Sequence, residues 1–357
     1  MKKRIKILIA GAGGGGYGVE IMKSLRLSSV PYFIIGCDMS ENGFGLFSAD
    51  KGYVIPPASS PNYLKVLLKI CVKEHIQVLI PGSDHDLRRI SENRFLFSKK
   101  GIFIPINNQE VIDIGLNKMS TIEFLKINGF NALRTIGIDT LDQISGFDSF
   151  PVIIKPLIGG GSADTFIAQD RSELQFFCQY LLKNGQKPVV QEYIGNPDNE
   201  YTIGILSDQD GKIMSATGFR RYILSGLSNR LRLRSHRKRE TLAVSSGISQ
   251  GEVISDPHII GQCKKVAQAI GSRGPINIQC RVVKGQVYIF EINPRFSGTT
   301  YMRALTGINE PDLLIRKYVL NERIPKVLKS KHGRVLRGLI EQFIPCSLAS
   351  KIIKMGN

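Results

Sequence analysis

The chain has 357 residues, of which 42% are hydrophobic and 22% charged, and its formal net charge is +18. This composition excludes a mainly disordered chain, and no run of about 18 apolar residues predicts a membrane-spanning helix. The six cysteines are scattered without a C-x-x-C pair, so we expect reduced thiols in a cytoplasmic protein rather than a zinc site or a disulfide framework. A field this positive attracts acidic or phosphorylated partners.

The first third of the chain alternates between apolar runs and helical spacing. We predict strands at 5–10, 32–37 and 78–80 and helices at 19–25 and 63–74. Strand–helix–strand alternation is typical of a parallel sheet with crossover helices. The sequence therefore predicts an α/β unit over residues 1–113.

A glycine-rich loop, Gly11–Gly16, follows the first predicted strand and contains G-x-G-x-x-G. Glycines let a backbone approach a phosphate closely, and Asp38 stands where a ribose-binding acid would lie. One interpretation is an NAD(P)-dependent oxidoreductase that uses this loop. The other is that the glycines only permit a sharp turn between strand and helix.

The middle of the chain has a different pattern, with turn signals between strands. We predict helices at 117–129 and 256–270 and strands at 151–156, 189–194, 201–206, 212–219, 276–283 and 286–292. Hairpins with flanking helices indicate an α+β unit over residues 114–320. The basic tail, 321–357, is expected to pack on one of the two units and is a candidate homodimer interface.

A lysine and a glycine-rich loop follow the strand at 151–156. The strand ends in Lys155 and Pro156, and Gly159, Gly160, Gly161 and Ser162 come next. Backbone amides, a hydroxyl and an ammonium suit phosphate groups. The loop is not the P-loop motif because the lysine precedes the glycines, and a plain surface loop stays an alternative.

Polar side chains end the last predicted hairpin. Glu291 and Asn293 are two residues apart on a strand, so their oxygens share a face. Hard oxygen ligands of this kind suit Mg²⁺ held jointly with phosphates, and Arg295 beside them fits a phosphoryl-transfer site. The alternative is a solvated hairpin edge.

The turn of this hairpin decides whether Gln279 joins the set. A two-residue turn at 284–285 places Gln279 opposite Phe290, whereas a three-residue turn at 284–286 places it opposite Glu291. Only the second register brings the oxygens of Gln279, Glu291 and Asn293 together.

These motifs, in this order, resemble the ATP-grasp superfamily, and most closely one half of the carbamoyl-phosphate synthase large subunit. The residues that carry the resemblance are Lys118, 151–156, 159–162, 191–194, Glu200, Tyr201, Gln279 and 291–295. The resemblance implies a Rossmann-like pre-ATP-grasp domain at 1–113. It also implies an ATP-grasp domain of two α+β subdomains at 114–320, with a lid at about 135–195, and leaves 321–357 as a basic tail.

The resemblance also implies roles, position by position. Nucleotide-binding residues would be Lys118 and Lys155 at the phosphates, Gly159, Gly160, Gly161 and Ser162 as the closing loop, Gln191, Glu192, Tyr193 and Ile194 at the adenine, and Glu200 at the ribose. Metal ligands would be Gln279, Glu291 and Asn293. The catalytic residues would be Arg295, Lys155 and Glu291.

The implied activity is an ATP-dependent carboxylate–amine (or thiol) ligase that uses Mg²⁺ or Mn²⁺ and forms an acyl-phosphate and ADP. Its substrates would be small carboxylates and amines, acidic or phosphorylated. Synthesis of carbamoyl phosphate itself is disfavoured because the chain carries one half where the large subunit carries two. A non-catalytic ATP-binding regulator is a further alternative. The basic segment 220–239 has only Phe219 and Tyr222 near it for base stacking, so nucleic acid is disfavoured.

Overall fold

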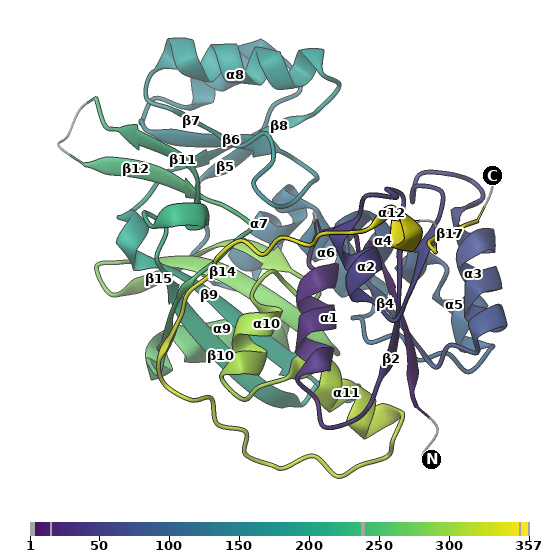
Figure 1. Ribbon diagram of the computed structural model, residues 1–357. Coiled ribbons are helices and arrows are strands. Elements are labelled where there is room, and N and C mark those ends of the chain that lie inside the picture. The colour runs from purple at the N-terminus through teal and green to yellow at the C-terminus, as the bar shows by residue number, and fades with distance from the viewer. Residues whose placement is uncertain (1–3, 15, 237–239, 350, 356–357) are drawn as a thin grey trace.

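The N-terminal unit is built on a parallel sheet with the strand order β17-β3-β2-β1-β4 (Figure 1). It belongs to a computed structural model that describes residues 4–14, 16–236, 240–349 and 351–355. The strands are β1 (Lys6–Ala10), β2 (Phe33–Asp38), β3 (Lys51–Val54), β4 (Val78–Pro81) and β17 (Ile353–Lys354). The helices are α1 (Gly18–Arg26), α2 (Phe44–Ser48), α3 (Tyr63–Glu74), α4 (Asp84–Glu92), α5 (Arg94–Ser98) and α6 (Gln109–Leu116).

This sheet confirms the predicted α/β class, with two strands that we did not predict, β3 and β17. Strand β3 is only four residues long, with Lys51 and Gly52 among them, so it has no apolar run to reveal it. Both faces of the sheet are covered by apolar clusters. One cluster joins Ile7 and Ile9 to Phe296 and Ile315 of the following unit, so the two units share a core.

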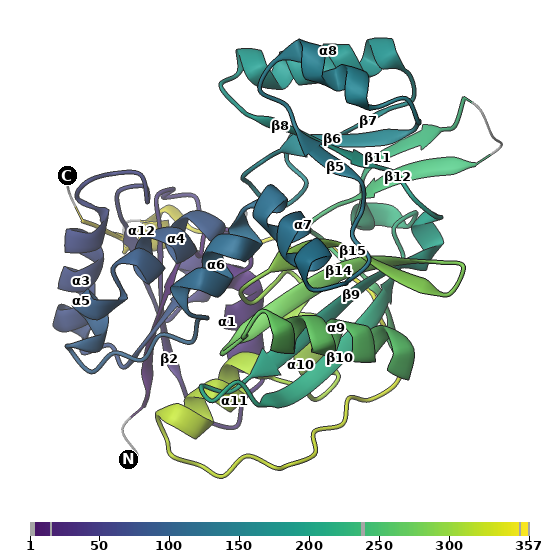
Figure 2. The same cartoon turned by 180° about the vertical axis from the view of Figure 1, so that it is seen from behind.

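The second unit is an antiparallel sheet with the strand order β15-β14-β9-β10-β13-β16. Its strands are β9 (Glu200–Ser207), β10 (Ile213–Arg221), β13 (Gly251–Ile254), β14 (Pro275–Val283), β15 (Gln286–Asn293) and β16 (Arg334–Val335). Helices α7 (Lys118–Ile127), α9 (Pro257–Ala269), α10 (Thr300–Leu305) and α11 (Glu310–Tyr318) surround it. Seen from behind, α9 crosses the back of this sheet (Figure 2).

Alternating side chains explain why α9 lies there. Ile203 and Ile205 of β9 and Ile276 and Ile278 of β14 are buried in one cluster with the apolar stripe of α9. The helix begins at Pro257, where the carboxylate of Asp256 accepts hydrogen bonds from two backbone amides of the first turn. The predicted α+β class is thereby confirmed.

A smaller sheet, the lid, lies above the large one and has the strand order β5-β8-β6-β7. It consists of β5 (Thr135–Gly137), β6 (Val152–Pro156), β7 (Phe166–Ala168) and β8 (Pro188–Glu192), with the 3₁₀ turn η1 (Leu141–Gly146) and α8 (Arg171–Lys183). Val152 and Ile154 of β6 pack against Leu174 and Leu181 of α8. The opposite face of the lid therefore turns toward the large sheet.

A separate hairpin, β11 (Asn229–Arg234) and β12 (Thr241–Ser245), extends beneath the lid (Figure 1). Leu231 and Leu233 cluster with Ile153 and Ile167 of the lid. Two short 3₁₀ turns, η2 (Pro197–Asn199) and η3 (Gly226–Ser228), precede β9 and β11. The hairpin therefore packs against the lid, although η3 and β10 connect it to the large sheet.

The C-terminal segment contacts both units, whereas we expected it to pack on one. Strand β16 pairs with β13 of the large sheet, and β17 pairs with β3 of the parallel sheet. Between them, Arg337 forms an ion pair of 2.7 Å with Glu20 of α1, and α12 (Cys346–Ala349) precedes β17. Two-residue strands leave no periodic signal, so the sequence could not reveal this pairing.

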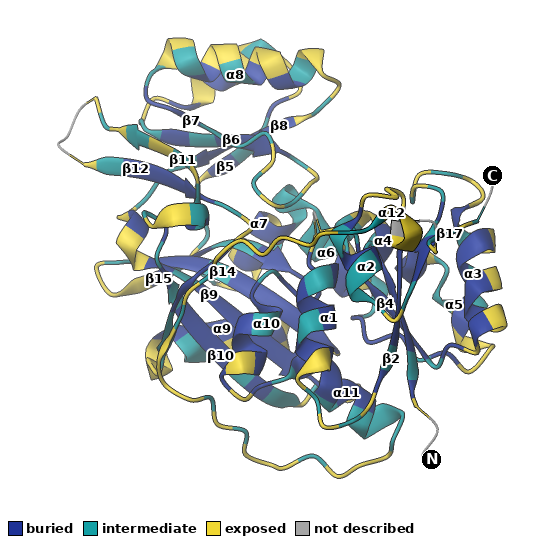
Figure 3. Cartoon of the chain, viewed as in Figure 1, coloured by how far each residue is buried: buried dark blue, intermediate teal, exposed yellow. Residues whose placement is uncertain are grey.

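Burial follows the strands, which are dark along most of their length in Figure 3. All six cysteines are free, and only Cys346 is exposed. Within the described ranges, no helix combines the length and the hydropathy needed to cross a membrane.

Candidate functional site

A cleft of about 750 Å³ lies between the lid and the large sheet. Twelve of the fifteen predicted site residues line it: Lys118, Lys155, Gly159, Gly160, Ser162, Gln191, Glu192, Tyr193, Ile194, Glu200, Gln279 and Glu291. Gly161, Asn293 and Arg295 are not part of its lining. Residues separated by more than 170 positions in the chain therefore meet in one cavity.

The hairpin β14–β15 settles the register that the sequence left open, through a β-bulge that we did not consider. Its turn is the two-residue one, because Val283 pairs with Gln286. A β-bulge then leaves Phe290 unpaired, so Gln279 faces Glu291 all the same. The amide nitrogen Nε2 of Gln279 donates to Oε2 of Glu291 at 2.6 Å.

Asn293 lies further along the same strand, opposite Asn277 of β14, and is buried. It is two residues from Glu291, so the two side chains start on the same face of β15. The oxygens of Gln279, Glu291 and Asn293 therefore occupy one surface at the end of the hairpin, next to the cleft.

Lys118 opens helix α7 and points at the glycine loop. Oδ1 of Asn117 caps the helix by accepting from Met119 N and Ser120 N, at 3.0 and 3.2 Å. The ammonium Nζ of Lys118 donates to the carbonyl oxygen of Gly159 at 2.8 Å. Burial lowers the pKa of Lys118, and the charges of Glu291 and Asp84 oppose that shift.

Lys155 reaches the cleft from the end of β6. Its Nζ donates to Oε1 of Gln191 at 2.9 Å, and Nε2 of Gln191 donates to Oγ1 of Thr135 at 2.9 Å. Burial, and after it the positive charge of Lys118, lowers the pKa of Lys155 to about 8. One buried and one half-buried ammonium group thus face a cavity in which an anion would neutralise them.

This pKa predicts a pH-dependent affinity for Mg-ATP. The protonated form of Lys155 attracts phosphates, and it is lost as the pH rises through about 8. We expect the dissociation constant, measured by calorimetry, to rise between pH 7 and 9.5, approaching about tenfold per unit above the pKa. Lys155→Gln should bind more weakly at pH 7 and show a flatter profile. An unchanged slope in that variant would contradict the assignment.

The glycine loop of the lid closes onto the N-terminal unit. A Cβ atom placed on Gly160 would lie 2.6 Å from Oδ2 of Asp84, the first residue of α4. The same carboxylate accepts from Nε of Arg295 at 2.8 Å. Because no side chain fits at Gly160, the loop can approach this ion pair closely.

Arg295 is held in place on two sides. Its guanidinium lies 4.4 Å from the ring centre of Tyr17, and Asp84 neutralises its charge. Burial alone would lower the pKa of Arg295, but Asp84, Tyr17 and Glu291 together outweigh it and the pKa is raised. Tyr17 was not predicted as a neighbour of this site, because nothing in its local pattern connects it with a residue so distant in the chain.

Glu200 lies at the edge of the cleft between two arginines. Oε1 of Glu200 accepts from Nη1 of Arg221 at 2.9 Å, and Oε2 forms an ion pair of 3.0 Å with Arg281. Arg221 also donates to Oε1 of Gln279 at 3.0 Å. Both arginines escaped the prediction. Arg281 could have been predicted, because it stands two residues from Gln279 on one strand and so shares a face with it.

The loop Gly11–Gly16 is packed against its own unit, and Gly15 lies outside the described residues. Asp38, the candidate ribose ligand, accepts from the backbone nitrogens of Gly13 and Ser40 at 2.6 and 3.0 Å. A Cβ atom on Gly16 would come within 2.4 Å of the carbonyl oxygen of Gly82. Close packing thus accounts for Gly16, and the bond to Asp38 involves the backbone of Gly13.

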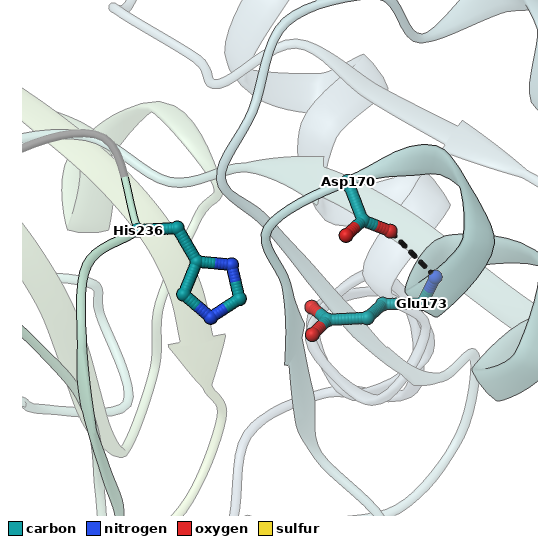
Figure 4. Close-up of side chains that lie close together, drawn as sticks. All are labelled: Asp170, Glu173 and His236. Atoms are coloured by element: carbon teal, nitrogen blue, oxygen red, sulfur yellow. Dashed lines mark hydrogen bonds between the residues drawn. The ribbon is translucent and has the colours of Figure 1, made fainter.

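One further group of ligand-type side chains joins the hairpin to the lid. Ligand atoms of Asp170, Glu173 and His236 lie within 4.8 Å of one another (Figure 4). Asp170 caps α8 by accepting from the backbone nitrogen of Glu173 at 2.9 Å, and Glu173 accepts from the backbone nitrogen of Gln169 at 2.7 Å. Both carboxylates thus take part in capping the helix. The basic segment continues beyond His236 into 237–239, which lie outside the described residues.

Two sequence families match separate parts of the chain. Residues 7–105 match the family described as PylC-like, N-terminal domain. Residues 186–337 match the family described as ATP-grasp in the biosynthetic pathway with Ter operon. The resemblance to the ATP-grasp superfamily is therefore confirmed.

Curated relatives agree with this result. The carbamoyl phosphate synthase large chain of Clostridium beijerinckii is 27% identical over 219 residues, which are 57% of this chain and 18% of that protein. The protein of the same name from Thermoanaerobacter sp. is 24% identical over 326 residues, 85% of this chain and 28% of that protein. The chain thus spans less than a third of the length of these relatives.

Solved structures share the fold. The N5-carboxyaminoimidazole synthetase of Staphylococcus aureus has a TM-score of 0.62 and 16% identity, over 92% of this chain and 81% of that one. The D-alanine–D-alanine ligase of Bacillus anthracis has a TM-score of 0.59 and 15% identity, over 89% of this chain and 98% of that one.

Proposed function

We propose that the chain is an ATP-dependent carboxylate–amine ligase, because residues 186–337 match an ATP-grasp family and residues 7–105 match a PylC-like N-terminal domain. Its γ-phosphoryl donor is ATP, and its products include ADP and phosphate. The alternative is a carboxylate–thiol ligase, in which a thiol replaces the amine. We propose the boundaries 1–113, 114–320 and 321–357 for the N-terminal domain, the ATP-grasp domain and the C-terminal segment.

The single observation that carries this proposal is the convergence of cations and hard oxygens on one cleft. Lys155 enters it from the lid and Lys118 from the start of α7, and Glu291 and Gln279 enter it from the large sheet. A buried and a half-buried ammonium group facing a carboxylate and an amide suit a polyphosphate with a divalent cation. If the end of the hairpin were only a solvated edge, there would be no reason for these cations and oxygens to converge on one cleft.

We assign the nucleotide to the cleft as follows. Lys118, Lys155 and the loop at 159–162 contact the phosphates. Gln191 and the backbone at 192–194 hold the adenine, and Glu200 stands near the ribose. Glu200 is also fixed by Arg221 and Arg281, so its carboxylate has a structural task besides any contact with a hydroxyl.

Gln279, Glu291 and Asn293 have the donor chemistry of a magnesium site. Carboxylate and amide oxygens are hard ligands, and they stand beside the ammonium groups that contact the phosphates. Mg²⁺ bound there supplies charge neutralisation to the phosphates. The Nε2 of Gln279 donates to Glu291, so the amide of Gln279 must rotate for its oxygen to serve as a ligand.

The protein's own residues then act by positioning and by charge. The substrate carboxylate attacks the γ-phosphorus in line, the bond to the bridging oxygen of ADP breaks, and an acyl-phosphate forms. The amine attacks the acyl carbon, loses a proton and displaces phosphate. Arg295, oriented by Asp84, stabilises the negative charge that develops on the transferred group or the acyl oxygen.

Thermal unfolding separates this proposal from its alternatives. We expect Mg-ATP at about 100 times its dissociation constant to stabilise the protein by roughly 2.7 kcal/mol, and Lys155→Ala to abolish the shift. NAD(H) and NADP(H) should have no effect. Stabilisation by a dinucleotide alone would support an oxidoreductase. Binding of Mg-ATP without ADP release, across a panel of acids with amines, would support a regulator.

A further inference from the structure

We propose that three exposed arginines of β11, which we call the arginine ladder (Arg230, Arg232 and Arg234), bind an acidic peptide segment of the carboxylate substrate. The inference rests on the proposed ligase function and narrows its substrate to a peptide. It gives a binding role to part of the basic segment 220–239, for which the proposed ATP site has no use.

The ladder is free to bind a partner. Arg230, Arg232 and Arg234 are exposed, while the residues between them are partly buried. In contrast to Arg220 and Arg221, they make no ion pair with any described residue, and their side chains make no hydrogen bond there. Three unpaired guanidinium groups on one strand face form a strong local anion site.

The leucines between them fix the direction of the ladder. Leu231 and Leu233 pack into the lid cluster with Ile167, so the arginines alternate onto the face turned away from the lid. The hairpin is also tied to the lid by Gln169, whose side chain bonds the carbonyl oxygen of Arg234 and the backbone nitrogen of His236 at 3.2 and 2.7 Å. The arginine ladder therefore sits on a hairpin fastened to the lid.

The strand register connects the ladder to the reacting end of the cleft. Asn229 pairs with Ser245, and Arg234 pairs with Thr241 near the tip. The carbonyl oxygen of Ser245 accepts from Oγ of Ser162 in the glycine loop at 2.6 Å. The ladder thus starts at Arg230 beside the proposed phosphate end and leads away from it. A chain bound along the ladder would have one end beside the site of phosphoryl transfer.

Spacing and composition favour a peptide. Alternate residues of a strand are about 6.8 Å apart, so the ladder spans about 13–14 Å, more than a small acid can occupy. An extended peptide with acidic residues at alternate positions has the same period. Single-stranded nucleic acid normally stacks its bases on aromatic side chains, and β11 has none.

Fluorescence anisotropy with a labelled ten-residue poly-glutamate peptide tests the proposal. The ladder variant is Arg230→Gln, Arg232→Gln and Arg234→Gln. Its matched control is Lys100→Gln, Lys264→Gln and Lys265→Gln, three exposed lysines on α9 and after α5, with the same change in net charge. We expect binding by the wild type and the control, and a loss of about tenfold or more in the ladder variant.

Peptide binding and the thermal shift with Mg-ATP test the peptide inference and the ligase proposal separately. The ladder variant should keep the full thermal shift with Mg-ATP, because none of its three residues lines the cleft. Equal peptide binding by the ladder and control variants overturns the inference. Tighter, ladder-dependent binding of a ten-nucleotide oligothymidylate overturns it in favour of nucleic acid. Loss of the Mg-ATP shift in the wild type itself would count against the ligase, whatever the peptide does.

Discussion

Replacing Glu200 by glutamine is expected to lower the free energy of unfolding by about 3–5 kcal/mol. The carboxylate lies between Arg221 and Arg281, and the three side chains are 3%, 3% and 8% exposed. Without it, two guanidinium groups stay buried and lose the carboxylate that pairs with both. Burial already lowers the pKa of Arg221, which shows the cost of holding that charge in the interior.

The remaining partners of the two arginines are neutral. Arg221 donates to the carbonyl oxygen of Ser246 at 2.7 Å, and Arg281 donates to that of Ile194 at 2.9 Å. These bonds satisfy hydrogen-bond donors but do not replace the charge of Glu200. We therefore expect the loss of Glu200 to act mainly on stability, and to disturb the adenine-side backbone at Ile194 as a consequence.

Urea unfolding followed by circular dichroism measures this effect. Glu41→Gln is the matched control, because Glu41 also pairs with a basic residue, Lys354, but at an exposed position. We expect the control to behave like the wild type. The double variant Glu200→Gln, Arg221→Met should recover part of the lost stability, since it removes one orphaned charge. Identical midpoints for Glu200→Gln and Glu41→Gln would show that the buried carboxylate has no structural role.

Local patterns predicted the elements that hold the site. The strand that contains Lys155, the helix opened by Lys118 and the strand that contains Glu291 all have strong periodicity or a cap, so their positions follow from neighbouring residues. The register of Gln279 did not follow, because a bulge at Phe290 has no sequence signal of its own. The correct pairing with Glu291 depends on that one extra residue.

Contacts between distant segments were the least predictable part. Asp84 and Arg295 are 211 residues apart, and their pairing depends on how the two units share a core. Arg221 was visible only as one member of a basic run, and burial distinguishes it from the exposed arginines of β11. A charge run in a sequence does not say which of its members face the interior.

Glu291→Gln is expected to reduce the rate of ADP formation by about 10²–10³-fold. Under the proposed function, the carboxylate supplies the negative charge of the metal site, and its amide replacement keeps the shape but not the charge. Glu291 contacts Gln279 at 2.6 Å, and its charge also acts on Lys118 and Arg221. Without this negative charge Mg²⁺ is held more weakly, and the positive charges on the cationic side of the cleft lose a counter-charge.

The measurement does not need the natural substrates. Thermal shifts with ATP in the presence of Mg²⁺ or of EDTA report the metal's contribution to nucleotide binding, and slow ADP release reports turnover. In Glu291→Gln, the two shifts should become nearly equal, while the protein without nucleotide unfolds close to the wild-type temperature.

Glu123→Gln is the matched control, because Glu123 is exposed on α7 and does not line the cleft. It should keep both the Mg²⁺-dependent increment and the rate of ADP release. If Glu291→Gln also kept them, the metal would have to be bound elsewhere, and the convergence of Gln279, Glu291 and Asn293 would be structural. If Glu291→Gln lost ADP release but kept the increment, the carboxylate would act on the transferred phosphoryl group rather than on the metal.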